Sequence, residues 1–100
     1  MLDLHDSHGN HIANFVNGQL YDTHGRNIGH FREREGIFID MHGRYWGEIV
    51  DKKRLLYNNC SSYKSVLFGI YGNYGNIGNY GNYGNIGSCS YGGYSDVVIE

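Results

Sequence analysis

Proline is absent from this chain of 100 residues, and long apolar runs and basic blocks are missing as well. No apolar run approaches the roughly 20 residues that a membrane-spanning helix needs, so we expect no membrane partner. No window places apolar residues at the i, i+3, i+4 and i+7 positions of an amphipathic helix. The net charge of -2, without a Lys/Arg cluster, gives no electrostatic footprint for nucleic acid. These absences favour an all-β domain that does not bind nucleic acid.

Cysteine is also scarce. Cys60 and Cys89 are too few for a disulfide framework, and the first residues lack the charged leader and apolar segment of a secretory signal. We therefore expect a cytoplasmic protein with two reduced thiols, and a Cys60–Cys89 bridge stays open if the protein is exported. The sequence has no phosphate-binding loop, catalytic-cysteine signature or nucleophile elbow, so an enzyme is not expected. No cofactor is predicted.

The chain does contain a nine-residue motif, or phrase, that recurs several times. Residues 21–29 read YDTHGRNIG, and residues 39–47 repeat this as IDMHGRYWG. A looser copy, HDSHGNHIA, stands at residues 5–13. Repetition at this spacing predicts that the domain, residues 1–100, is built from a duplicated unit.

Each copy has the composition of a β-hairpin turn. Asp6, Asp22 and Asp40 stand at the first turn position, where the carboxylate can accept a hydrogen bond from the amide two residues on. A glycine three residues later suits a type I turn followed by a left-handed residue, the arrangement called a G1 bulge. A step of 18 residues beyond Asp40 reaches Asn58, which predicts a degenerate fourth copy. We therefore predict four β-hairpins within residues 1–68.

The outgoing strand of each hairpin carries a small residue at one fixed place, followed two positions later by an apolar residue on the same face. The small residues are Ala13, Gly29, Gly47 and Ser65. The incoming strands supply Leu4, Leu20, Phe38 and Leu56. Four such units would crowd around an axis, and small residues would relieve the crowding. The pattern predicts hairpins arranged around a pseudo-four-fold axis.

The composition changes to glycine, asparagine and tyrosine at residues 69–94. Glycine recurs at every third residue from Gly69 to Gly87, mostly in Gly-Asn-Tyr or Gly-Asn-Ile triplets. This period favours an extended helix of three residues per turn with an all-glycine edge, and a disordered prion-like segment is the alternative. Residues 95–100 are expected to form a last strand that pairs with residues 2–4 and closes the ring.

The phrase YDxxGRxIG, over residues 4–68, resembles the small bacterial proteins known as four-fold β-flowers. In that family successive hairpins sit as petals around a pseudo-four-fold axis, so the resemblance implies a fold and no particular activity. This chain departs from the pattern at His5, where the family has tyrosine, and at Ser61, which replaces the fourth turn glycine. The same phrase has a weaker resemblance to the YD-repeats of large secreted toxins, whose arrays are longer and differently spaced.

Histidines are the first candidates for a binding site. His8, His24 and His42 occupy equivalent places in three turns, and imidazoles from several loops can bind zinc, copper or nickel. The alternative is that histidine is tolerated before the turn glycine and recurs because the unit was duplicated.

Tyrosines of the tract are the second candidates. Tyr74, Tyr80 and Tyr83, with asparagines between them, would form an aromatic, amide-rich surface suited to a protein or glycan partner. The alternative is that these rings close the base of the hairpins or are disordered. The sequence by itself does not define a biochemical role. We expect a non-enzymatic binding or structural module, with a metal-binding protein as the first alternative and a small hydrolase-like enzyme as the second.

Overall fold

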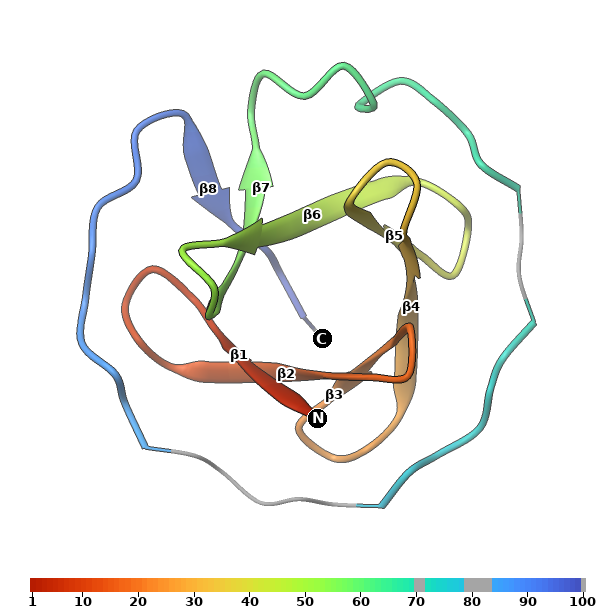
Figure 1. The fold of residues 1–100 in the computed structure, drawn as a ribbon, viewed down its shortest axis with the longest axis horizontal. Coiled ribbons are helices and arrows are strands. Elements are labelled where there is room, and N and C mark those ends of the chain that lie inside the picture. Colours follow the sequence, from red (N-terminus) through yellow and green to blue (C-terminus); the bar gives the residue numbers. More distant parts are fainter. Residues whose placement is uncertain (70–71, 79–83, 100) are drawn as a thin grey trace.

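The fold is all-β, as the sequence predicts. A computed structural model describes residues 1–69, 72–78 and 84–99, and all regular structure within them is strand (Figure 1). The strands are β1 (Leu2–His5), β2 (His11–Val16), β3 (Gln19–Asp22), β4 (Asn27–Arg32), β5 (Ile37–Asp40), β6 (Tyr45–Val50), β7 (Arg54–Asn58) and β8 (Tyr94–Asp96). These residues include no helix long and apolar enough to span a membrane.

Seven of these strands form a closed barrel. Each strand from β1 to β7 pairs antiparallel with the next, and β1 pairs in parallel with β7 through His5 and Arg54. The amide of His5 donates to the carbonyl of Lys53 over 2.8 Å at this seam. The short strand β8 adds to β7 on the same edge. The expected pairing of the last strand with residues 2–4 is therefore wrong, because β1 closes the ring with β7 itself.

Three turns share one geometry, and this confirms the predicted bulged hairpins. Asp22 Oδ1 accepts hydrogen bonds of 2.9 Å from the amides two and four residues on. The Gly25 amide donates to the Asp22 carbonyl over 3.0 Å, and Gly25 has a φ of +85°, a conformation that glycine adopts without steric cost. Asp6 and Asp40 accept the equivalent bonds over 2.8 to 3.0 Å. One local sequence thus specifies one turn three times.

The fourth predicted hairpin is wrong in its outgoing strand. Asn58 keeps the first bond of the turn, since its Oδ1 accepts from the Cys60 amide over 2.9 Å. Ser61, however, stands where the other turns have a left-handed glycine, and it has no positive φ. Residues 62–65 are turn and not strand, and Ser65 is exposed instead of contributing to a crowded axis. The strand that follows β7 in the sheet is β8, from the far end of the chain.

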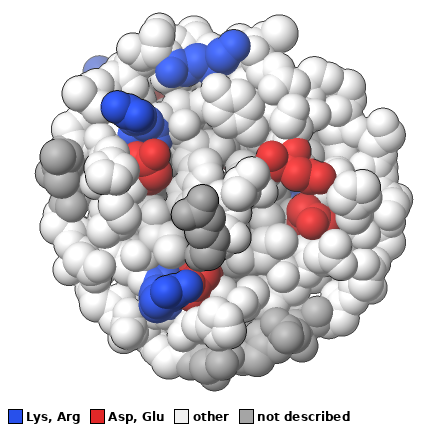
Figure 2. Space-filling model, turned by 180° about the vertical axis from the view of Figure 1, so that it is seen from behind, with Lys and Arg blue, Asp and Glu red and all other residues white. Residues whose placement is uncertain are grey.

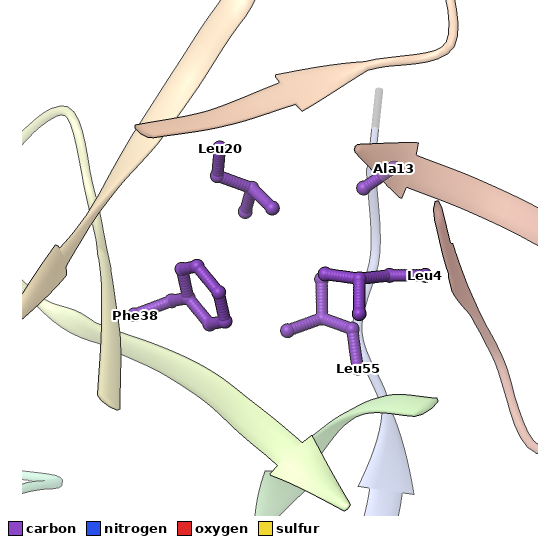
Figure 3. Close-up of a cluster of buried hydrophobic side chains, with 5 residues drawn as sticks. All are labelled: Leu4, Ala13, Leu20, Phe38 and Leu55. Carbon is purple, nitrogen blue, oxygen red and sulfur yellow. The ribbon is translucent and has the colours of Figure 1, made fainter. Parts of the chain in front are cut away.

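The core lies inside the barrel and is formed by buried side chains that face one another: Leu4, Ala13, Leu20, Phe38 and Leu55 (Figure 3). Three of the four small residues are cross-strand neighbours of large ones: Ala13 of Leu4, Gly29 of Leu20 and Gly47 of Phe38. A Cβ atom at Gly29 would lie 2.6 Å from the carbonyl oxygen of Ile39, so no larger residue fits without movement of the backbone.

The register of β7 differs by one residue from the expected one. Leu55 pairs with Ile49, while Leu56 pairs with Glu48. Leu55 therefore takes the place in the core cluster that was expected for Leu56. Leu56 is nevertheless only 1% exposed, so both leucines contribute to burial.

The described parts of the glycine-rich tract lie around the outside of the barrel (Figure 1). We call residues 68–69, 72–78 and 84–87 the strap. Three strap amides, spaced nine residues apart, donate to the carbonyls of the turn glycines over 2.9 to 3.0 Å: Phe68 to Gly43, Ile77 to Gly25 and Ile86 to Gly9. The structurally important period is thus nine residues, or three triplets, and each nine-residue step carries the strap from one turn to the next.

The expected helix of three residues per turn is wrong. Such a helix needs a negative φ at every residue, whereas four strap glycines have φ values of +80° to +93°. These glycines are Gly69, Gly75, Gly78 and Gly87. The strap is therefore extended chain interrupted by left-handed glycines, and its backbone lies directly on the turns. A Cβ atom on Gly25 would come within 2.0 Å of the carbonyl oxygen of Gly78.

The strap contact can be measured with a matched pair of substitutions. Gly18 and Gly25 have similar φ values of +79° and +85°, but a Cβ atom on Gly18 would meet nothing within 4 Å. Gly18→Ala should cost about 1 kcal/mol, the penalty for a left-handed conformation. Gly25→Ala should cost about 2 kcal/mol more, because it must also displace the strap backbone. Urea denaturation measures both losses, and equal losses would contradict close docking of the strap.

Candidate functional site

The segment after β8 turns into the centre of the ring (Figure 1). We call residues Val97–Ile99 the tail. Val97 and Ile99 pack against the core cluster, whereas Val98 between them is 75% exposed. This alternation is that of an extended strand. The tail thus covers one end of the barrel, which we call the mouth.

Two grooves flank the tail, and both are lined in part by Val98 and Ile99. The first groove has a volume of about 510 Å³ and is also lined by His11, Ile12, Asp22, Thr23, His24, Arg26 and Val97. The second groove has a volume of about 380 Å³ and is also lined by Asn27, Ile28, Asp40, Met41, His42 and Trp46. Each groove lies between a bulged turn and the strand that leaves the preceding turn. The repeat therefore builds two similar grooves.

The three candidate histidines are exposed but lie in different surroundings. His24 lines the first groove and His42 lines the second. His8 lies beside Asp96, with 3.5 Å between its Nε2 and Oδ2 of the carboxylate. Within the described ranges no three His, Cys, Asp or Glu side chains are grouped so as to hold a metal ion. The metal site stays a prediction from sequence.

The rim of the first groove carries an ion pair. Burial of the Asp22 carboxylate acts to raise its pKa, but hydrogen bonds from the Arg26 amide, the Arg26 guanidinium and the His24 amide outweigh this and lower the pKa. Arg26 Nε lies 2.7 Å from Asp22 Oδ2. Asp22 therefore stays ionised and holds the half-exposed guanidinium at the rim. Figure 2 shows the molecule from behind, where several of the basic side chains stand beside acidic ones.

Tyr74 lines a separate cavity on the outside of the barrel. Its ring meets that of His30 at 5.6 Å, and its amide donates to Asn27 Oδ1 over 3.0 Å. The cavity has a volume of about 310 Å³ and also includes Gln19 and residues 31–35. Tyr80 and Tyr83, the other tyrosines of the predicted surface, lie outside the described residues.

The polar groups of this cavity are largely held by one another. Burial lowers the pKa of His30, so its imidazole is neutral near pH 7, and its Nδ1 is hydrogen-bonded to the Gln19 amide oxygen. Arg32 binds Glu35 through two nitrogens, each 3.0 Å from a carboxylate oxygen. A neutral ring, an amide and a tyrosine edge suit a polar, uncharged ligand.

The mouth and its two grooves were not predicted from the sequence. Trp46 packs against the core and also lines the second groove. The alternation of Val97, Val98 and Ile99 was the available signal, and it was assigned to ring closure. The two thiols left open by the sequence, Cys60 and Cys89, are exposed and not joined to each other.

No protein-family model, curated protein or solved structure matches this chain.

The ion pair at the rim predicts a pH dependence of stability. The folded-state pKa of Asp22 lies below its usual value of 3.8, so the ionised carboxylate stabilises the fold above that pH and loses its effect as the pH falls through the folded value. Asp22→Asn should lower stability near pH 7 by about 1 kcal/mol, a modest value because Arg26 is half-exposed to solvent. Urea denaturation between pH 7 and pH 3 should show the difference shrinking. A difference that stays constant would contradict this assignment.

Proposed function

We propose that this chain is a non-enzymatic protein-interaction module that binds an extended segment of a partner at the mouth of the barrel. The observation that carries the proposal is the tail, which lies extended over the mouth with a groove on each side. A polypeptide with alternating buried and exposed side chains already fits this surface. Extended peptides that add to a sheet edge are recognised in this way, by backbone pairing and by pockets for alternate side chains.

The floor of the mouth supplies apolar contact. Ile12, Ile28 and Trp46, from equivalent places of three hairpins, are half-buried and pack against the core cluster. Burial of their remaining apolar surface by a partner would contribute about 25 cal/mol per Å². Polar side chains such as Arg26 and His42 stand at the edges of the grooves. An apolar floor with a polar rim is typical of recognition sites.

We further propose that the fold is the four-fold β-flower that the repeated phrase resembles. The pairs β1–β2, β3–β4 and β5–β6 would be three petals, and β7 with β8 would be the fourth, with residues 59–93 inserted between its strands. The shared turn geometry and the antiparallel pairing of β7 with β8 support this arrangement. Proton NMR should detect contacts between the paired residues Tyr57 and Ser95. Their absence in the folded protein would count against a fourth petal.

Peptide binding at the mouth can be followed through Trp46, the only tryptophan in the chain. The probe is a synthetic peptide of sequence YSDVVIE, that of residues 94–100. We expect a saturable but weak change of Trp46 emission, because the peptide must displace the tail. Ile28→Ala should weaken binding several-fold through lost apolar contact. The Tyr74 side chain lines neither groove, so Tyr74→Ala should leave binding unchanged. The absence of saturable change at any peptide concentration would refute the proposal.

A second candidate function is glycan binding at the cavity beside Tyr74. The exposed ring of Tyr74, the neutral imidazole of His30 and the amide of Gln19 favour an uncharged, hydroxyl-rich ligand there. The same variants separate the two functions on a glycan array. Tyr74→Ala should remove glycan binding and Ile28→Ala should preserve it, whereas a wild-type protein that retains no glycan would end this candidate.

A further inference from the structure

Asp96, the last residue of β8, is fastened to the first turn. Its Oδ1 accepts a hydrogen bond of 2.8 Å from the amide of Ser7, and its Oδ2 accepts one of 2.9 Å from the Ser7 hydroxyl. His8 Nε2 lies 3.5 Å from the same Oδ2. Ser7 and His8 thus form a small acceptor site for a carboxylate, which we call the carboxylate site.

A buried cation lies beneath the carboxylate site. Arg54 is only 8% exposed, and its Nη1 donates to the carbonyls of Asp6 and Gly87 over 2.9 and 2.8 Å, with the Ser7 carbonyl at 3.4 Å. These bonds fix the first turn in place, and the guanidinium adds positive charge behind it. A negative group that approaches Ser7 from outside is therefore favoured electrostatically.

Three kinds of contact follow one another along residues 94–99. The backbone of β8 pairs with β7, where Tyr94 lies opposite Asn58 and Asp96 lies opposite Leu56. The Asp96 carboxylate occupies the carboxylate site. Val97 and Ile99 then face the core while Val98 faces solvent. The sequence that fits the mouth is thus an extended strand with an acidic residue followed by the pattern apolar, any, apolar.

We propose that residues 94–99 act as an internal ligand, and that the partner presents an extended segment of the same pattern. This inference rests on the proposed function of the mouth. The partner's acidic side chain binds Ser7 and His8, its two apolar side chains replace Val97 and Ile99, and its backbone pairs with β7. The tail and the partner then compete for one site, so the free protein is autoinhibited.

The internal ligand is attached in a way that permits exchange. β8 has three residues, pairs with β7 alone among the described strands, and leaves Ser95 and Asp96 exposed. Gly92 and Gly93, which directly precede it, are exposed as well. Segments with few buried contacts open at low cost in free energy. Release would uncover the edge of β7 at residues 56–58, and an open strand edge is a template for strand addition.

The test measures two fluorescently labelled peptides, YSDVVIE and YSAVVIE, by polarisation against three full-length proteins. The proteins are the wild type, Asp96→Ala and Tyr74→Ala, the last a control whose side chain lines the separate outer cavity and neither groove of the mouth. Asp96→Ala weakens the internal ligand, so we expect it to bind YSDVVIE about tenfold more tightly than the wild type does. It should also prefer YSDVVIE over YSAVVIE by a similar factor, and Tyr74→Ala should match the wild type.

Each contrary outcome has a separate meaning. Equal affinity of wild type and Asp96→Ala for YSDVVIE would overturn autoinhibition, and equal affinity of Asp96→Ala for the two peptides would overturn the carboxylate site. In both cases the mouth itself would remain a peptide site. Failure of all folded proteins to bind either peptide would instead refute the proposed function.

Two further experiments control for variants that fail to fold. Thermal unfolding establishes that each variant is folded, and Ser7→Ala weakens the same anchor from the other side if Asp96→Ala does not fold. In Ser7→Ala the tail and the peptide lose the same contact, so the preference for YSDVVIE should shrink to about twofold or less. Sedimentation of Asp96→Ala as a dimer without peptide binding would overturn the inference in favour of a second copy of this chain as the occupant.

Discussion

The structure depends on three left-handed glycines, Gly9, Gly25 and Gly43, that lie between the hairpins and the strap. Each glycine closes a bulged turn with the preceding aspartate, and its carbonyl receives one amide of the strap. The absence of a side chain has two effects at each of these glycines: it permits the positive φ, and it leaves room for the backbone of the strap. The glycine of each bulged turn therefore contributes both to the hairpin and to the docking of the strap.

Closure of the barrel leaves a mouth that the chain covers with its own last residues. The seam between β1 and β7 is short, and Arg54 connects it to the first turn and to the end of the strap. The core is modest, so the half-buried floor of the mouth gains from the cover that Val97 and Ile99 provide. Under the proposed function, the same cover would compete with the partner, so that stability and binding would be coupled at one surface.

Local chemistry made part of this structure predictable. Aspartate followed by glycine three residues later favours a bulged turn through local contacts, so the three bulged hairpins and the all-β class could be inferred. The fourth hairpin could not, because Ser61 removes the left-handed position and nothing local shows where β7 finds its next neighbour. Leu55 and Leu56 are both apolar, so only the pairing of β7 with β6 decides which of them enters the core cluster.

The sequence by itself determined the repeated turn, the need for small residues beside large ones and the presence of a regular glycine tract. Only the tertiary structure decided that nine residues of the strap separate its contacts with successive hairpin turns. It also decided that the three candidate histidines lie in different surroundings and that the tail covers the mouth. The physical reason is how far apart in the sequence the interacting residues lie. Turn geometry arises from atoms a few bonds apart, whereas the carboxylate site joins residues 7 and 96, which are 89 positions apart and meet only when the barrel closes.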